Sequence, residues 1–321
     1  MAESDTTVRA GHLLARSATG GAILVLVVIV ASAFLRLAQA AEAWPDAIVI
    51  VRFAHRVAAM GVSFLVLTIA VVCWSVRRHH TGEAIAAAVL VALTIFLSVL
   101  GRATPGSGMP AVTLGNLLGG MAMLGLFWWL RLTARDPWAP PAPTGTGVNA
   151  SAICWVGLGL VVIEIAMGAQ VSASHAAASC TTIPDCRGYW WPADATLAAF
   201  DPRHLFEPLS DAAPGVEARR QALHMAHRFG AVLVLGYWAI LAVVMRARNL
   251  VSARAVAVVA LMLVVEAGLG MTIVGTGAIL VAVAHNAWAA LLLMAAIGAV
   301  FQSRLAEEAS VSAVCQTVTS K

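Results

Sequence analysis

Charged side chains are scarce in this sequence. They make up 11% of its 321 residues, whereas hydrophobic residues make up 60% and the mean hydropathy is +0.87. Because soluble domains carry about 25% charged residues, this composition excludes a water-soluble globular protein. It also argues against a nucleic-acid partner, since the formal net charge of +4 comes from arginines in the loops between apolar runs. The chain is predicted to be a polytopic membrane protein.

The sequence also lacks the regular apolar–polar alternation of membrane-spanning strands, which excludes a transmembrane β-barrel. Long apolar runs take its place. Eight of them reach the length of roughly 20 residues that a helix needs to cross a bilayer. We therefore expect an all-α membrane protein with eight transmembrane helices. They are placed near residues 20–38, 50–76, 83–101, 110–131, 151–172, 220–245, 252–274 and 278–301.

Acidic residues are nearly absent from the short loops on one side of the predicted membrane, and arginines are more frequent on that side. The positive-inside rule then places both termini in the cytoplasm or, in a mitochondrion, in the matrix. A linker rich in proline and glycine divides the chain into two four-helix bundles. The predicted parts are a tail at 1–19, a bundle at 20–136, the linker at 137–150, a bundle at 151–302 with an outer loop at 174–218, and a tail at 303–321.

Cysteines are few, and the topology separates the five of them. Cys73 and Cys154 fall in predicted spans and Cys315 falls in the C-terminal tail, where unpaired thiols are expected. Cys180 and Cys186 lie six residues apart in the outer loop, where an oxidising compartment favours pairing. We expect a disulfide between these two.

Histidines occur in repeated contexts. Ala54-His55-Arg56 and Ala226-His227-Arg228 each lead into an apolar run, and His285 lies in a later one. Aligning Asn116 with His285 also superposes several glycines of the two halves without a gap. The match predicts that the two bundles are pseudo-symmetric repeats related by an axis along the membrane normal.

Ionisable residues at a membrane helix are expensive unless something binds them. Neutral imidazole is a common axial ligand of heme iron, and helix bundles hold cofactors between facing helices. His227 and His285 are therefore predicted to be an axial pair for one heme, and the alternative for both is structural hydrogen bonding. His224 shares a helix face with His227. It either contacts a heme propionate or lies at the membrane interface without a role.

The first half offers a third candidate ligand, His55. Asn116 either hydrogen-bonds a water or oxygen species beside an iron or makes an interhelical polar contact. Arg56 and Arg228 suit heme propionates, because a guanidinium binds a carboxylate bidentately; the alternative is snorkelling towards lipid head groups. Arg52 adds positive charge at the outer mouth of this half.

Two carboxylates, Glu164 and Glu266, lie at membrane depth in corresponding spans, each four residues before a glycine. They are either proton carriers or neutral groups that pack by hydrogen bonding.

Taken together, these features resemble the heme A synthase family of bacterial cytoplasmic and mitochondrial inner membranes. The likeness rests on the two four-helix repeats, on the His-Arg pair in the second helix of each half, and on the late His285. Arg36-Leu37 followed by Trp44-Pro45 is similar to the family's first outer loop. Cys180 to Cys186 followed by Arg187-Gly188-Tyr189-Trp190 is similar to its third.

The resemblance implies an enzyme that oxidises the C8 methyl of heme O to the formyl group of heme A for cytochrome oxidase. The C-terminal half would hold heme b through His227 and His285, and the N-terminal half would hold heme O as substrate and heme A as product. The implied partners are heme O, membrane lipid, a heme O synthase or oxidase assembly factors, and an electron donor that the sequence does not identify.

The first half departs from the family's pattern. Members carry a glutamate three residues before the first His and a His in the fourth helix, where this chain has Arg52 and Asn116. The first outer loop also lacks a cysteine pair that some members have. His55, Arg52 and Asn116 are thus predicted to form an altered catalytic site. The alternative function is a b-type hemoprotein that transfers electrons or assists oxidase assembly without catalysis. A transporter is a third, weaker reading, because the histidines lie near the outer ends of the spans.

Overall fold

Eight long helices make up almost all of the chain in the computed structural model, which describes residues 2–76, 81–103, 108–134, 149–192, 197–250 and 252–319. All eight are long and apolar enough to cross a membrane. They are α1 (Ala2–Ala40), α2 (Pro45–Val71), α3 (Thr81–Ala103), α4 (Pro110–Thr133), α5 (Ala150–Ala173), α6 (Val216–Ala247), α7 (Ala253–Thr276) and α8 (Ile279–Thr319). A π-helical turn, η1 (Val72–Val76), extends α2.

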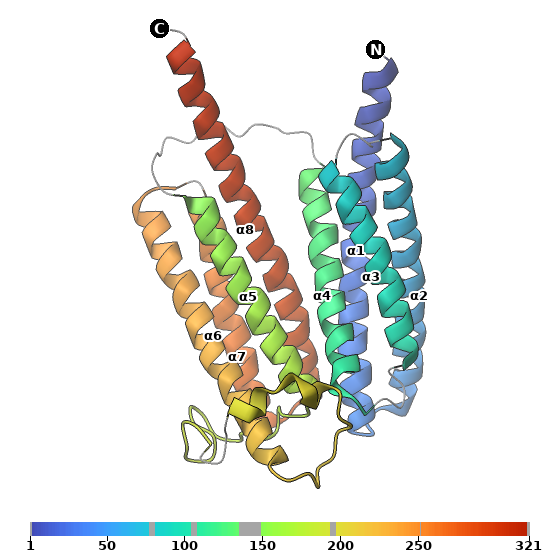
Figure 1. Ribbon diagram of the computed structural model, residues 1–321, viewed down its shortest axis with the longest axis vertical. Coiled ribbons are helices and arrows are strands. Elements are labelled where there is room, and N and C mark those ends of the chain that lie inside the picture. Colours follow the sequence, from blue (N-terminus) through green and yellow to red (C-terminus); the bar gives the residue numbers. More distant parts are fainter. Residues whose placement is uncertain are drawn as a thin grey trace.

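The prediction of an all-α protein with eight membrane-spanning helices is confirmed, and each predicted span matches one helix to within a few residues except at two ends. There, α1 and α8 continue as helix through most of the predicted tails at 1–19 and 303–321. Both ends of the chain lie at the same end of the molecule (Figure 1). Most of the linker predicted at 137–150, and the thiol of Cys315, fall outside the described residues.

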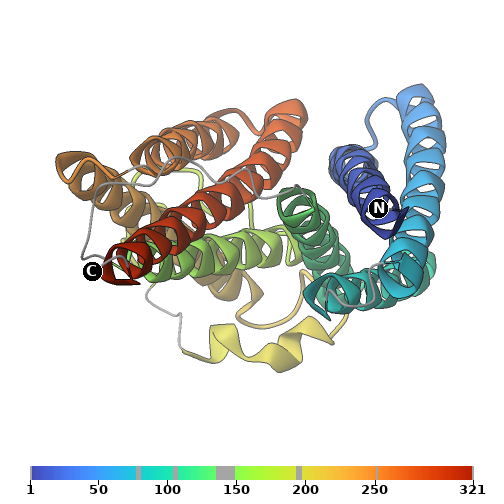
Figure 2. The same ribbon diagram turned by 90° about the horizontal axis from the view of Figure 1, so that it is seen from above.

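Within each half the four helices pack in a ring. In the first half α1 and α3 each pack against both α2 and α4, so that α2 and α4 lie diagonally opposite each other. In the second half α5 and α7 each pack against both α6 and α8, which leaves α6 and α8 on the diagonal (Figure 2). The predicted pseudo-symmetry of the halves stays a prediction, but their shared ring order places the histidine-bearing helices in equivalent positions.

The halves meet through α1 and α4 on one side and α5 and α8 on the other. Arg36 of α1 donates a hydrogen bond to the Ser172 hydroxyl near the end of α5. Close packing also depends on small residues. A Cβ at Gly21 of α1 would lie 2.1 Å from a ring carbon of Phe127 on α4. In the second half the fully buried Trp238 donates to the Gly157 carbonyl at 3.3 Å.

Local sequence explains where several helices begin and end. Pro45 and Pro110 begin α2 and α4, because proline lacks the N–H that a first turn leaves unbonded. Gly277 ends α7 in the left-handed conformation, which glycine adopts without steric cost. Outward-facing residues such as Phe53 and Phe64 are largely exposed, as expected of helices whose outer faces contact lipid.

The loop between α5 and α6 lies at the end of the molecule opposite the two termini (Figure 1). It contains two short 3-10 helices, η2 (Leu197–Phe200), which packs on α6, and η3 (Pro202–Leu205), which packs on α4. The Leu209 amide donates to the Gly108 carbonyl at 2.9 Å, just before α4. The loop therefore spans from the second half to the first, rather than covering the second half alone.

Asp201 caps η3 at its N-terminal end. Its carboxylate accepts hydrogen bonds from the Arg203 amide and Nε, both at 2.9 Å, and these lower the pKa of Asp201 from 3.8 to about 2. A carboxyl whose pKa is lower in the folded state stabilises that state above its ordinary pKa and loses the effect as the pH falls towards the folded value.

We therefore expect hydrogen exchange at residues 197–206, corrected for the intrinsic rate, to speed up between about pH 4 and pH 2. Asp201→Asn should remove this dependence. Equal pH profiles for the two proteins would contradict the assignment.

Candidate functional site

Two histidines of the second half each face a buried carboxylate from a neighbouring helix. His227 Nδ1 on α6 lies 2.6 Å from Oε1 of Glu164 on α5. His285 Nδ1 on α8 lies 3.3 Å from Oε1 of Glu266 on α7. Both histidines that the sequence predicted as a pair thus lie in the second half, each beside a carboxylate of a neighbouring helix, and their role as heme ligands stays a prediction.

Glycines make room for these side chains. A Cβ at Gly168, one turn after Glu164, would lie 2.9 Å from Cε1 of His227. At Gly230, one turn after His227, a Cβ would lie 2.0 Å from Oε2 of Glu164. Gly270 follows Glu266 by one turn, and there a Cβ would lie 3.6 Å from Cε1 of His285. Any larger residue at Gly168 or Gly230 would displace the ring or the carboxylate.

A carboxylate beside Nδ1 favours the tautomer that carries its proton on Nδ1 and leaves the Nε2 lone pair for a metal. Both Nδ1 atoms are buried and make no aligned hydrogen bond, although the His227–Glu164 distance is that of one. Two such imidazoles on diagonal helices fit the two axial positions of a heme iron.

The donor set fits heme better than a metal bound by protein alone. No group of three or more His, Cys, Asp or Glu side chains that could hold a metal ion occurs among the described residues. A structural zinc needs four protein ligands and a catalytic zinc needs three. A porphyrin supplies four nitrogens of its own, so that two imidazoles complete its iron.

His224 lies one turn before His227 and is 6% exposed. Its ring contacts the backbone of Ala176, at the start of the outer loop. Its Nδ1 has no hydrogen-bond partner. The propionate contact predicted for it stays a prediction. The observed contact joins α6 to the loop.

Arg228 holds the outer loop onto α6. Its guanidinium donates to the backbone carbonyls of Cys180, Thr182 and Asp185, at 3.1, 2.8 and 2.7 Å. Nη1 and Nη2 both take part in these bonds. A propionate contact by Arg228 stays a prediction, and the structure adds this binding of the loop, which sequence reasoning missed.

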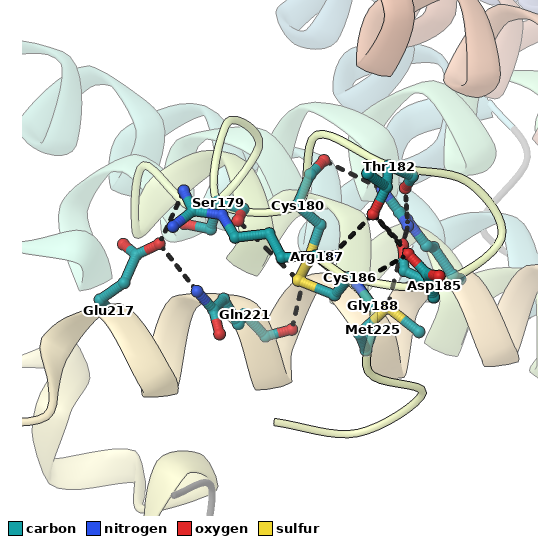
Figure 3. The surroundings of a disulfide bond; sticks show 11 residues. Ser179, Cys180, Thr182, Asp185, Cys186, Arg187, Gly188, Glu217, Gln221 and Met225 are labelled. Carbon is teal, nitrogen blue, oxygen red and sulfur yellow. Dashed lines mark hydrogen bonds and ion pairs between the residues drawn. A yellow bond between two sulfur atoms is a disulfide. The ribbon is translucent and has the colours of Figure 1, made fainter. Parts of the chain in front are cut away.

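The predicted disulfide between Cys180 and Cys186 is present, and Figure 3 shows the polar contacts around it. Arg187 forms an ion pair with Glu217 of α6 at 3.4 Å. The Thr182 hydroxyl and the Gly188 amide donate to the Asp185 carboxylate and lower the pKa of Asp185. The disulfide thus closes a short turn, and Arg228 and Glu217 of α6 also bind this turn.

Replacing both cysteines with serine should destabilise this turn by about 2 kcal/mol in the chain-entropy model for so short a loop. The helices should stay folded, because the contacts of Arg228 and Glu217 remain. Hydrogen exchange at residues 176–192 measures the change, and the helical segments serve as the internal control. Titratable free thiols at both positions in protein purified without reductant would contradict the pairing.

The first half is built differently. His55 of α2 is half-buried, and its Nε2 lies 2.9 Å from the Ser32 hydroxyl of α1 rather than beside a carboxylate. Arg52 and Arg56 are exposed on α2, and Asn116 is half-buried on α4. His55 and Asn116 thus lie on the diagonal helices of their bundle, as His227 and His285 do in theirs.

Two comparisons with known proteins show the family of this chain. Residues 42–297 match the model of the COX15-CtaA family, described as cytochrome oxidase assembly protein. The chain is also 30% identical over 242 residues to a heme A synthase from Shewanella oneidensis, an alignment that covers 75% of this chain and 72% of that protein. The chain belongs to the COX15-CtaA family. The family resemblance predicted from the sequence is confirmed.

The region matched by the COX15-CtaA model begins just before α2 and ends within α8. It therefore contains His55 and Asn116 of the first half as well as His227 and His285 of the second.

Within this COX15-CtaA protein, sequence reasoning noticed Glu164 and Glu266 but missed their histidine partners. A usable signal was present, because each glutamate precedes a glycine by four residues and lies on the helix just before a histidine-bearing one.

Proposed function

We propose that this protein is a heme A synthase that acts in the assembly of cytochrome oxidase. It would take heme O from the membrane and oxidise its C8 methyl group to a formyl group. With dioxygen as the oxidant the reaction balances as R–CH3 + O2 → R–CHO + H2O. The observation that carries the proposal is the pair of half-buried histidines on α6 and α8, each beside a carboxylate, in a chain that belongs to the COX15-CtaA family.

In this proposal the second half is the resident cofactor half. His227 and His285 would bind heme b through Nε2, because Nδ1 of each ring faces a glutamate. A bound heme would supply one-electron transfer. The surrounding helices and the loop bound by Arg228 would keep water from a heme held there.

The first half is then the substrate half. Arg52 and Arg56, in the first half of α2, would offer guanidinium groups to the two propionates of heme O at the outer end. Ser32 holds the His55 ring at Nε2. If substrate binding broke this hydrogen bond, Nε2 of His55 would become free.

The remaining parts of the proposal concern location. The chain would lie in a bacterial cytoplasmic membrane or a mitochondrial inner membrane, with both termini on the cytoplasmic or matrix side. The arginine bias of the loops supports this orientation. Heme O would reach the first half from the lipid, delivered by a heme O synthase or an assembly factor.

The test is to co-express the protein with a heme O synthase in a host that makes no heme A, and to extract the hemes for chromatography and mass spectrometry. We expect heme A or its alcohol precursor, and neither should appear with His285→Ala as the control. Recovery of heme b alone from the natural sequence would overturn the proposal in favour of a b-type hemoprotein without this activity.

A further inference from the structure

We propose that Glu164 and Glu266 are positioning residues, which hold the two axial imidazoles so that each Nε2 faces the heme iron. The inference rests on the proposed heme b in the second half. It goes beyond the proposed pair of histidine ligands, because it gives the two carboxylates a role. Neither the family match nor the heme A synthase from Shewanella oneidensis assigns that role to them.

Both glutamates make the same contact in the same way. Each approaches Nδ1 of its histidine through Oε1, from the helix that precedes the histidine-bearing helix in the chain. Both carboxylates are largely buried, at 13% and 15% exposure. The two pairs therefore share the ring nitrogen, the carboxylate oxygen and the order of the two helices in the chain.

Two glycines beside Glu164 and His227 leave space for the carboxylate as well as for the ring. Oε2 of Glu164 occupies the place of a side chain at Gly230, on the same face of α6 as His227. Gly168 leaves space for the ring itself. A carboxylate that only carried protons along the membrane would not need this close fit on both sides.

The first half supplies an internal comparison. Nε2 of His55 lies 2.9 Å from the Ser32 hydroxyl, so its observed contact is made at the other ring nitrogen. The contact with a neighbouring helix is therefore made at Nδ1 in the second half and at Nε2 in the first half. Both histidines that the proposed function assigns as ligands of heme b contact a carboxylate of a neighbouring helix at Nδ1, whereas the loop residue His204 contacts Glu207 three residues along its own segment.

The chemistry gives a directional expectation. A carboxylate is a stronger hydrogen-bond acceptor than an amide, so it makes the imidazole a stronger donor to iron and favours the ferric state. Gln has nearly the same size as Glu but lacks the charge. Loss of such a supporting contact commonly costs about 10- to 100-fold in affinity. A tenfold loss of heme affinity in the ferric state alone would raise the midpoint potential of the heme by about 59 mV.

The experiment measures heme content, the ferric electron paramagnetic resonance spectrum and the midpoint potential of purified Glu164→Gln and Glu266→Gln. We expect about tenfold weaker heme retention, shifted ferric g-values and a higher potential in each. Activity is not needed as a readout. Because the two variants affect different interfaces, the inference can still be tested with one if the other fails to fold.

Matched controls are available at the same interfaces. Tyr237→Phe removes a 2.8 Å hydrogen bond from α6 to the Ile153 carbonyl of α5. Trp288→Phe removes a 2.8 Å hydrogen bond from α8 to the Met262 carbonyl of α7. Both loosen the packing without touching a histidine–glutamate pair, so the spectrum and the potential should stay as in the natural protein.

The results of this experiment distinguish failure of the positioning role from failure of the proposed function. If the natural protein holds a bis-histidine heme and both Gln variants keep its g-values and potential, the positioning role is wrong and the proposed function stands. Shifts of equal size in the controls would also overturn it, because they would show an effect of packing. If the natural protein binds no bis-histidine heme, the proposed function fails and the positioning role fails with it.

Discussion

Replacing His227 or His285 with alanine is expected to abolish the low-spin heme spectrum of the purified protein. A six-coordinate iron with two imidazoles is low-spin, and removal of either ligand leaves the iron five-coordinate or bound to solvent. In the structure Nδ1 of each ring lies beside a largely buried carboxylate. Nearby side chains offer little substitute, since His224 contacts the loop at Ala176.

The measurement is the absorption spectrum of the oxidised and reduced protein, together with heme content per polypeptide. His204→Ala is a suitable control, because His204 lies in η3 and pairs with Glu207 at 2.7 Å. Its spectrum should match that of the natural protein. Retention of the low-spin spectrum by both single variants at His227 and His285 would show that the axial ligands lie elsewhere.

A second large effect is expected in the first half, where Arg52→Glu combined with Asn116→His should raise the rate of heme A formation about 100-fold. Oxidation of the methyl group breaks two C–H bonds and transfers their hydrogens to the oxygen that leaves as water, which requires a group that relays protons. A carboxylate one turn before His55 would lie on the same helix face as that ring. Arginine cannot accept a proton at any relevant pH. We therefore expect the natural sequence to form heme A slowly.

Asn116 enters the same prediction because α4 lies diagonally across the bundle from α2, as α8 does from α6. A histidine there would give the first half the ligand arrangement of the second. The assay is the co-expression with heme O synthase, with heme A measured per unit of protein.

Arg52→Gln combined with Asn116→His is the matched control, because it removes the charge at residue 52 without supplying a base. A rate equal to that of the Glu-containing variant would show that the carboxylate contributes nothing. Heme A formation by the natural sequence at the rate of the double variant would show that the site is not impaired.

Much of the architecture could be predicted from the sequence. Runs such as 83–101 and 151–172 are long enough to span a bilayer, and they match α3 and α5 within a few residues. The helical extensions of α1 and α8 were not predicted, because polar tails give no apolar run from which to predict a helix. The pairing of Cys180 with Cys186 was predictable, since six residues of separation and an outer location leave few other partners.

The sequence by itself therefore determined the number of helices, the family, the disulfide and the identity of the candidate histidines. All of these follow from composition, apolar length and short spacings along the chain. Only the tertiary structure decided which polar groups meet, such as Glu164 with His227 and Arg228 with the carbonyls of the outer loop. A helix that is apolar on nearly every side carries little periodic signal to fix its rotation about its axis. The rotation is set by packing against neighbours, where Gly168 and Gly230 admit a ring and a carboxylate that other residues would exclude.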